Sequence, residues 1–183
     1  MSKGFTLVEV LVAMAIFLIA VILIFSIYLT SQKFYRTTEI KAEILQNARV
    51  ILERMTRELR QTQDIVTVLP QAPDNPDSPP MSEIEFQDGH SPDYYYIRYY
   101  VSTTTGEIIR EYKVYCLDVC EACSTYFKWD APQVYGCSLE NRVVGEFAQE
   151  MKFWGAGIIN VSLKLQKINE EIDFQTNVFS RNF

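Results

Sequence analysis

Four cysteines in the second half of the chain are the residues best suited to covalent or metal chemistry. They are Cys116, Cys120, Cys123 and Cys137. By number they suffice for a structural zinc site with four thiolates. In an oxidising compartment the same thiols form disulfides. Disulfides are therefore the favoured interpretation if this part of the chain lies outside the cytoplasm, but three pairings, a zinc site and free thiols all stay open.

The other side chains offer little catalytic chemistry. His90 is the only histidine, so the chain has neither a Ser/His/Asp set nor a histidine-based metal site; its turn-like surroundings predict an exposed position. Alternation along a strand sends clustered tyrosines to both faces of a sheet, which favours packing over a ligand platform. We expect no enzyme activity and no cofactor. The tyrosines concerned are Tyr94, Tyr95, Tyr96, Tyr99 and Tyr100.

An uncharged segment near the N-terminus is long enough to anchor the chain in a membrane. Residues 10–29, VLVAMAIFLIAVILIFSIYL, form a run of 20 residues without a charge. A helix needs about this length to cross a hydrocarbon core about 30 Å thick. The net charge is −6 and the pI is 4.9, so the chain has no excess of basic residues of the kind that nucleic-acid binding requires. The sequence therefore predicts a single-pass membrane protein with no nucleic-acid partner.

The residues that precede the apolar run do not form an ordinary secretory signal. Such a signal has an apolar region of about 7–15 residues followed by a cleavage site with small residues, whereas this run is longer and continues into an amphipathic helix. A carboxylate at the edge of hydrocarbon is costly, so Glu9 needs a partner. Thr6 lies three residues earlier and fits a capping box, and the helix dipole favours an acid in the first turn.

The segment KGFTLVE, residues 3–9, resembles the cleavage and methylation signal of type IV pilins and type II secretion pseudopilins. In that signal a short basic leader ends in Gly, and Phe, Thr, Leu, a small apolar residue and Glu follow. The resemblance implies that a prepilin peptidase cuts after Gly4 and methylates the new amine of Phe5. It also implies that Glu9 pairs with the Phe5 amine of a neighbouring subunit and sets the register of assembly.

The resemblance also implies where the protein works and with what. It places the precursor in the inner (cytoplasmic) membrane with a cytoplasmic N-terminus and an extracytoplasmic head, and in a filament after processing. Partners would be the prepilin peptidase, other pilin or pseudopilin subunits, the inner-membrane assembly platform and, before assembly, lipid. Charge counting alone predicts the opposite orientation, because Lys33, Arg36, Lys41 and Arg49 all follow the apolar run.

The rest of the chain predicts an α+β fold, with a long N-terminal helix packed on a C-terminal antiparallel sheet. We expect a leader at 1–4, a transmembrane helix at 5–30, an amphipathic helix at 31–65 and a β head at 66–183. Leu45 and Leu52 are predicted to widen the apolar stripe, and Glu53 with Arg57 and Arg54 with Glu58 to pair on a solvated face. The stripe itself consists of Ile44, Ala48, Ile51, Met55 and Leu59.

Within the head, a proline-rich loop at 70–80 separates the helix from the strands. A hairpin is predicted for residues 94–101 and 108–116, which the segment STTTGE joins. Another strand is predicted for residues 84–86. Residues 158–166 and 172–179 predict a second hairpin. The cysteine loop 116–137 reads as irregular, and VVGEFAQEMKFW that follows is open between a helix and a strand.

Taken together, these features predict a structural filament subunit. Residues 48–65, ARVILERMTRELRQTQDI, resemble the helix of J-type minor pseudopilins and related minor pilins, which implies a tip or initiation subunit. Two alternatives stay open. One is a single-pass, extracytoplasmic binding module with an uncleaved anchor and a tyrosine-rich head; the other is a membrane-tethered metalloprotein that uses the four cysteines.

Overall fold

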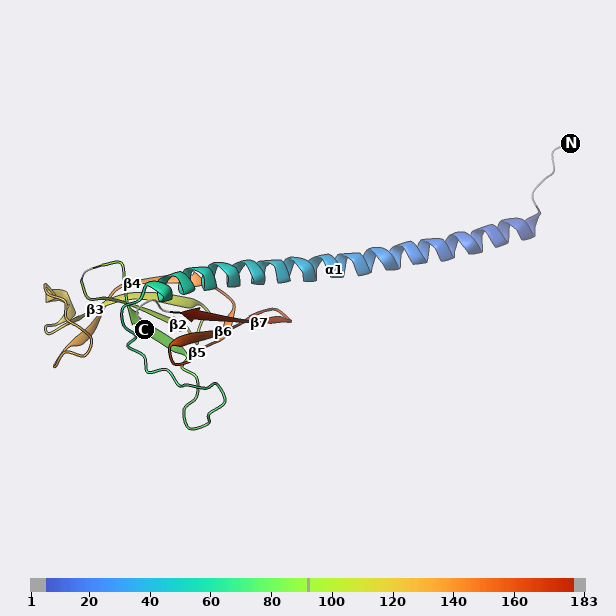
Figure 1. Ribbon diagram of the computed structural model, residues 1–183. Helices are drawn as coiled ribbons and strands as arrows, with labels where there is room; N and C mark the ends of the chain where they lie inside the picture. Colours follow the sequence, from blue (N-terminus) through green and yellow to red (C-terminus); the bar gives the residue numbers. More distant parts are fainter. Residues whose placement is uncertain (1–5, 92, 180–183) are drawn as a thin grey trace. The chain divides into compact units, whose positions relative to one another are not determined.

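The computed structural model describes residues 6–91 and 93–179, which form a long N-terminal helix followed by antiparallel strands (Figure 1). The α+β class predicted from the sequence is therefore confirmed. Helix α1 spans Leu7–Gln61. The chain divides into two compact units, residues 1–42 and 43–183, and the boundary lies within α1.

In the first unit, α1 is an apolar helix whose surface is exposed. The most hydrophobic 18-residue window has none of its residues buried within the described chain, and α1 is long and apolar enough to cross a membrane. Two hydroxyl groups in or next to the apolar run bond to the helix backbone: Ser26 donates to the Leu23 carbonyl and Thr30 to the Ser26 carbonyl, each at 2.9 Å. Internal hydrogen bonding of this kind suits a segment surrounded by hydrocarbon.

In the second unit, one face of α1 is buried against strands. The predicted stripe is confirmed, since its five members are all buried: Ile44, Ala48, Ile51, Met55 and Leu59. Burial of each of the four larger side chains contributes about 1.5–3 kcal/mol, and burial of the Ala48 methyl group contributes less. The predicted widening is wrong at Leu45, which is 50% exposed, because it lies about 100° around the helix from Ile44. Leu52 is half-buried.

Helix α1 ends at Gln61, before the predicted end at residue 65. The chain that follows pairs with a strand instead, because the Gln87 amide donates to the Asp64 carbonyl at 2.8 Å. The buried Thr62 hydroxyl lies 2.9 Å from the Gln87 carbonyl oxygen. A Cβ at Gly89 would lie 1.6 Å from the Gln61 carbonyl oxygen, so only glycine allows this close approach.

The first sheet has the order β1-β2-β3-β4, with every neighbour antiparallel. The hairpin predicted from STTTGE is confirmed, with Val101 opposite Ile108. Strand β4 was not predicted; it includes the end of the cysteine loop and the beginning of the segment left open between helix and strand. The four strands are β1 (Glu83–Gln87), β2 (Tyr95–Val101), β3 (Ile108–Cys116) and β4 (Tyr135–Gly145).

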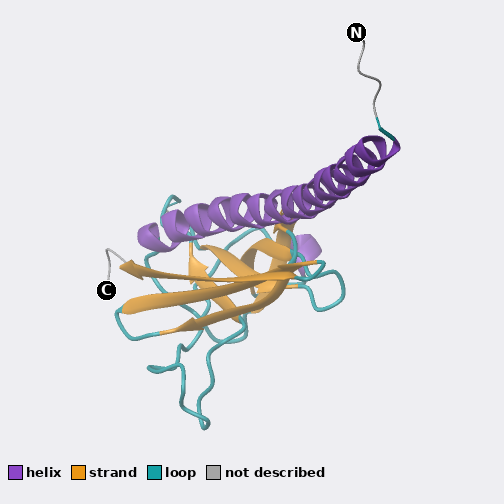
Figure 2. Cartoon of the chain, turned by 90° about the vertical axis from the view of Figure 1, so that its right-hand side faces the viewer, coloured by secondary structure: helices purple, strands orange, loops and turns teal. Residues whose placement is uncertain are grey.

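The second sheet has the order β5-β6-β7 and contains the second predicted hairpin. The open segment VVGEFAQEMKFW forms strand, not helix: its first residues end β4 and its last form β5, with Phe147 between them at φ 67°. Met81 and Phe153 exchange two backbone hydrogen bonds and so connect the sheets. Figure 2 shows the strands in orange. The three strands are β5 (Ala148–Trp154), β6 (Ile158–Lys167) and β7 (Glu170–Phe179).

Candidate functional site

The first turn of α1 holds an exposed carboxylate in a local hydrogen-bond cycle. The Thr6 amide and hydroxyl donate to Glu9 Oε2 at 2.9 and 3.0 Å, and the Glu9 amide donates to Thr6 Oγ1 at 3.4 Å. The predicted capping box is thus confirmed. Because the side chain of Glu9 is exposed, its carboxylate can accept further hydrogen bonds from a cation outside the chain.

The other two residues of the predicted processing signal, Gly4 and Phe5, lie outside the described residues. Their cleavage, methylation and pairing with Glu9 stay predictions. The geometry brings together only the downstream part of the signal, which is the capped first turn and the apolar helix that begins with it.

The apolar surface of α1 in the first unit is large. Leu7 is 76% exposed, Phe17 67% and Ile24 68%. Contiguous apolar exposure on this scale marks a surface that binds lipid or protein, because water disfavours it by about 25 cal/mol per Å². The site formed by Glu9 and this surface is therefore suited to insertion and helix packing.

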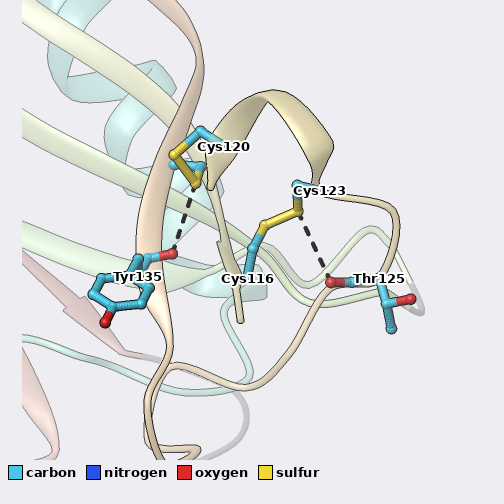
Figure 3. Close-up of a disulfide and its surroundings, with 6 residues drawn as sticks. Cys116, Cys120, Cys123, Thr125 and Tyr135 are labelled. Atoms are coloured by element: carbon cyan, nitrogen blue, oxygen red, sulfur yellow. Dashed lines mark hydrogen bonds between the residues drawn. A yellow bond between two sulfur atoms is a disulfide. The ribbon is translucent and has the colours of Figure 1, made fainter. Parts of the chain in front are cut away.

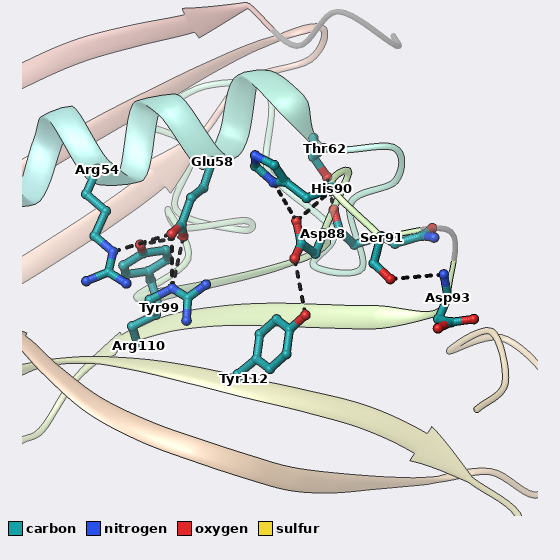
Figure 4. Close-up of polar contacts among 11 residues, drawn as sticks. Arg54, Glu58, Thr62, Asp88, His90, Ser91, Asp93, Tyr99, Arg110 and Tyr112 are labelled. Atoms are coloured by element: carbon teal, nitrogen blue, oxygen red, sulfur yellow. Dashed lines mark hydrogen bonds and ion pairs between the residues drawn. The ribbon is translucent and has the colours of Figure 1, made fainter. Parts of the chain in front are cut away.

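A second polar cluster, missed by sequence reasoning, joins α1 to the first sheet within the head (Figure 4). Both oxygens of Glu58 lie 3.1 Å from Arg110 Nε, and the Tyr99 hydroxyl donates to Glu58 Oε2 at 2.7 Å. The Glu58 and Arg110 side chains are only 14% and 12% exposed. Burial raises the pKa of the Tyr99 phenol, and the Glu58 carboxylate raises it further.

The prediction that Glu58 lies on a solvated face is therefore wrong, although Arg54 does pair with it at 3.4 Å. Glu58 immediately precedes the buried Leu59 and follows Met55 by three residues, so it borders the apolar stripe. That position was the signal in the sequence that it faces the sheet. Glu53 and Arg57 are exposed, as predicted.

The four cysteines form two interleaved disulfides, Cys116–Cys123 and Cys120–Cys137 (Figure 3). The disulfide interpretation is confirmed, and the zinc alternative loses its ligands because oxidised sulfurs are not thiolates. Cys116 and Cys137 are buried together with Val114, where β3 ends and β4 begins. The second bridge attaches the loop to β4, whose outer edge pairs with no other described strand.

The cysteine loop is more ordered than predicted. It contains the short helix η1 (Cys120–Ala122), and β4 begins at Tyr135, within the stretch expected to be irregular. The Trp129 amide donates to the Tyr96 hydroxyl at 3.0 Å, and Trp129 Nε1 donates to Asp64 Oδ2 at 3.1 Å. The loop thereby contacts both β2 and the chain that leaves α1.

The remaining candidates behave as structural residues. His90 is exposed, as predicted, and its Nδ1 lies 2.9 Å from Asp88 Oδ1. Tyr96 and Tyr99 are fully buried and only Tyr94 is largely exposed, at 41%, which confirms the packing interpretation. Among the described residues no group of three or more His, Cys, Asp or Glu side chains is arranged to hold a metal ion.

Comparison with known proteins bears on the N-terminus alone. Residues 1–25 match the family model of the prokaryotic N-terminal methylation motif. No curated protein and no solved structure matches the chain significantly. The matched region ends within the apolar helix and includes the capped turn with Glu9. The motif, which includes the first part of a helix able to cross a membrane, supports a subunit of the type IV pilin and pseudopilin kind.

Proposed function

We propose that this protein is a minor pilin or pseudopilin, a structural subunit of a type IV pilus or type II secretion filament. The observation that carries the proposal is the methylation motif at residues 1–25, placed directly on an apolar helix whose first turn exposes Glu9. Proteins with this motif are structural, and we propose that this chain likewise performs no catalysis.

The mechanism begins with an anchored precursor. Residues 5–30 hold the chain in the inner membrane with the N-terminus in the cytoplasm, and the prepilin peptidase cuts after Gly4 and methylates the Phe5 amine. The cationic amine then pairs with Glu9 of a neighbouring subunit. Desolvation offsets much of the attraction in such a pair, so helix packing supplies most of the assembly energy and the pair selects the register.

The head would lie outside the cytoplasm and contact sister subunits and the assembly platform. Two disulfides in the described head suit an oxidising compartment. The resemblance of residues 48–65 to J-type minor subunits supports a place at the tip or in the initiation complex rather than in the shaft.

Mass spectrometry of the mature N-terminus tests the proposal. The chain produced in cells that contain a prepilin peptidase should begin at N-methylated Phe5, and the same chain from cells without the peptidase should retain residues 1–4. Replacing Gly4 with Ile should leave an uncut precursor in both. An N-terminal peptide that retains Met1 in the presence of an active peptidase would instead support the binding module with an uncleaved anchor.

A further inference from the structure

The segment in which α1 leaves its apolar run carries three aromatic rings and two cations. We define the interfacial collar as Tyr28, Lys33, Phe34, Tyr35 and Arg36. Tyr28 is 56% exposed, Phe34 74% and Tyr35 72%, and both cations are exposed. The first acid after Glu9 is Glu39, so the collar holds two positive charges and no negative one.

The axial position of the collar matches the headgroup layer of a bilayer. At about 1.5 Å per residue, Lys33 lies about 6 Å and Arg36 about 10 Å beyond Leu29, the last residue of the apolar run. Headgroups extend about 6 Å beyond the hydrocarbon on each side. Lys33 therefore lies within that layer, and the long side chain of Arg36 can reach back into it.

The collar surrounds the helix, and this distribution distinguishes between two kinds of partner. At about 100° per residue, no gap between neighbouring collar positions around the axis exceeds about 100°. A single partner helix would contact one face only, whereas lipid contacts all faces at once. Exposure of all five side chains on a helix with no described packing partner at this level fits an annulus of lipid.

One aromatic member of the collar, Tyr28, has the orientation that an interface favours. Gln32 Nε2 donates to the Tyr28 hydroxyl at 2.6 Å, so the polar end of this ring lies on the side of Gln32, beyond the last residue of the apolar run. Tyrosine is enriched at membrane interfaces because its ring is apolar and its hydroxyl is hydrated. Rings of this kind set the depth of a helix, while the cations select the headgroup.

We infer that the interfacial collar binds anionic phospholipid headgroups in the leaflet on the side of the head and fixes the depth of α1 before assembly. This inference rests on the membrane-anchored state in the proposed function. It adds a lipid class to that state, because a cation near the membrane surface favours an anionic headgroup by about fivefold. Lys33 has no acid within one helical turn, whereas Glu39 lies three residues after Arg36 and reduces the contribution of that cation.

The test uses the full chain in vesicles of equimolar phosphatidylcholine and phosphatidylglycerol, with spin-labelled lipids to measure which lipid occupies the sites next to the helix. The wild-type chain should prefer phosphatidylglycerol, and the preference should weaken with added salt. The variant K33Q/R36Q should lose most of this preference, and the remainder would come from Lys3 at the other end of the apolar run. The matched variant K41Q/R49Q removes the same charge but begins about 18 Å beyond Leu29, more than the screening length of about 8–10 Å, and should retain the preference.

Equal occupancy in the wild type, or the same loss in both variants, would overturn the inference. These vesicles contain no peptidase and no sister subunits, so either result leaves the processing and assembly in the proposed function untouched. Failure of the wild-type chain to insert into vesicles would overturn the anchored state itself, and with it both proposals.

Discussion

The two units of this chain differ in whether their apolar surface is buried within the chain. In the head, apolar residues from one face of α1, beginning at Ile44, and from the strands form a buried core. In the first unit the large apolar residues are exposed, as with Ile22 at 66% and Ile24 at 68%. The head is therefore complete within one chain, whereas the first unit requires lipid or other helices.

The same contrast holds for two acids on α1. Glu58, in the head, has Arg110, Tyr99 and Arg54 as partners within the chain. Glu9, in the first unit, has only its local cap with Thr6 among the described residues. An acid satisfied inside the chain contributes to stability, and an exposed acid beside an apolar surface is placed for a partner outside it.

Replacing Glu9 with Val should have the largest effect, because it removes the carboxylate proposed to receive the Phe5 amine. We expect the variant to insert into the membrane normally and to be absent from filaments. Fractionation and quantification of the subunit in purified filaments measure both. Glu39→Val, which removes an exposed acid beyond the apolar run, is the matched control and should assemble. Wild-type levels of the Glu9 variant in filaments would exclude the register role.

A matched pair of methionine substitutions compares the two units directly. Met55 is fully buried and Met14 is 58% exposed. Met55→Ala should lower the free energy of unfolding of the head by about 2–5 kcal/mol, because it leaves a cavity under the sheet. Met14→Ala should leave it within about 0.5 kcal/mol. Denaturant unfolding of both variants in detergent, followed by near-ultraviolet circular dichroism, measures the difference; equal effects would contradict the division into an enclosed head and an exposed helix.

Sequence periodicity predicted the parts of the fold that are governed by local pattern. The stripe from Ile44 to Leu59 was correct because the buried face of a helix repeats every three or four residues. The two predicted hairpins were correct because alternation and a turn-forming loop lie close together in the sequence. The apolar run and the signal around Glu9 were visible for the same reason.

What the sequence did not show depends on tertiary contacts. Strand β4 has an exposed burial pattern with no clear alternation, so only its pairing with β3 identifies it. Two partners of Glu58, Tyr99 and Arg110, come from β2 and β3, far along the chain, and no local rule selects them. The disulfide pairing was open among three choices, because spacing does not say which cysteines the sheet brings together.

Removing one disulfide should destabilise the head by an intermediate amount. Cys120–Cys137 closes a longer segment, with a sequence separation of 17 against 7 for Cys116–Cys123. In the chain-entropy description, Cys120→Ala/Cys137→Ala should cost about 3 kcal/mol, and Cys116→Ala/Cys123→Ala somewhat less, about 2.4 kcal/mol. Thermal unfolding of the two double variants compares them. A smaller loss for the 120–137 pair would show that packing of the buried sulfurs outweighs loop closure.

The smallest predicted effect concerns the phenol of Tyr99. Burial and the nearby Glu58 carboxylate raise its pKa above the ordinary value of 10.0, so the folded chain holds this proton at a pH where the unfolded chain releases it. The stabilisation is complete below about pH 10 and is lost as the pH rises beyond it. Tyr99→Phe should cost about 1.5 kcal/mol at neutral pH, through the lost hydrogen bond to a charged group.

The same variant should lose less stability than the wild type between neutral and strongly alkaline pH, by at most about 1.4 kcal/mol per pH unit above 10. Unfolding curves recorded across that range measure the slope. Tyr94→Phe is the matched control, because its ring is 41% exposed and makes no contact with Glu58; it should follow the wild type. Identical slopes for Tyr99→Phe and the wild type would mean that the contact between α1 and β2 opens before the head unfolds. Glu58 would then not be an acid whose partners within the chain stabilise the head.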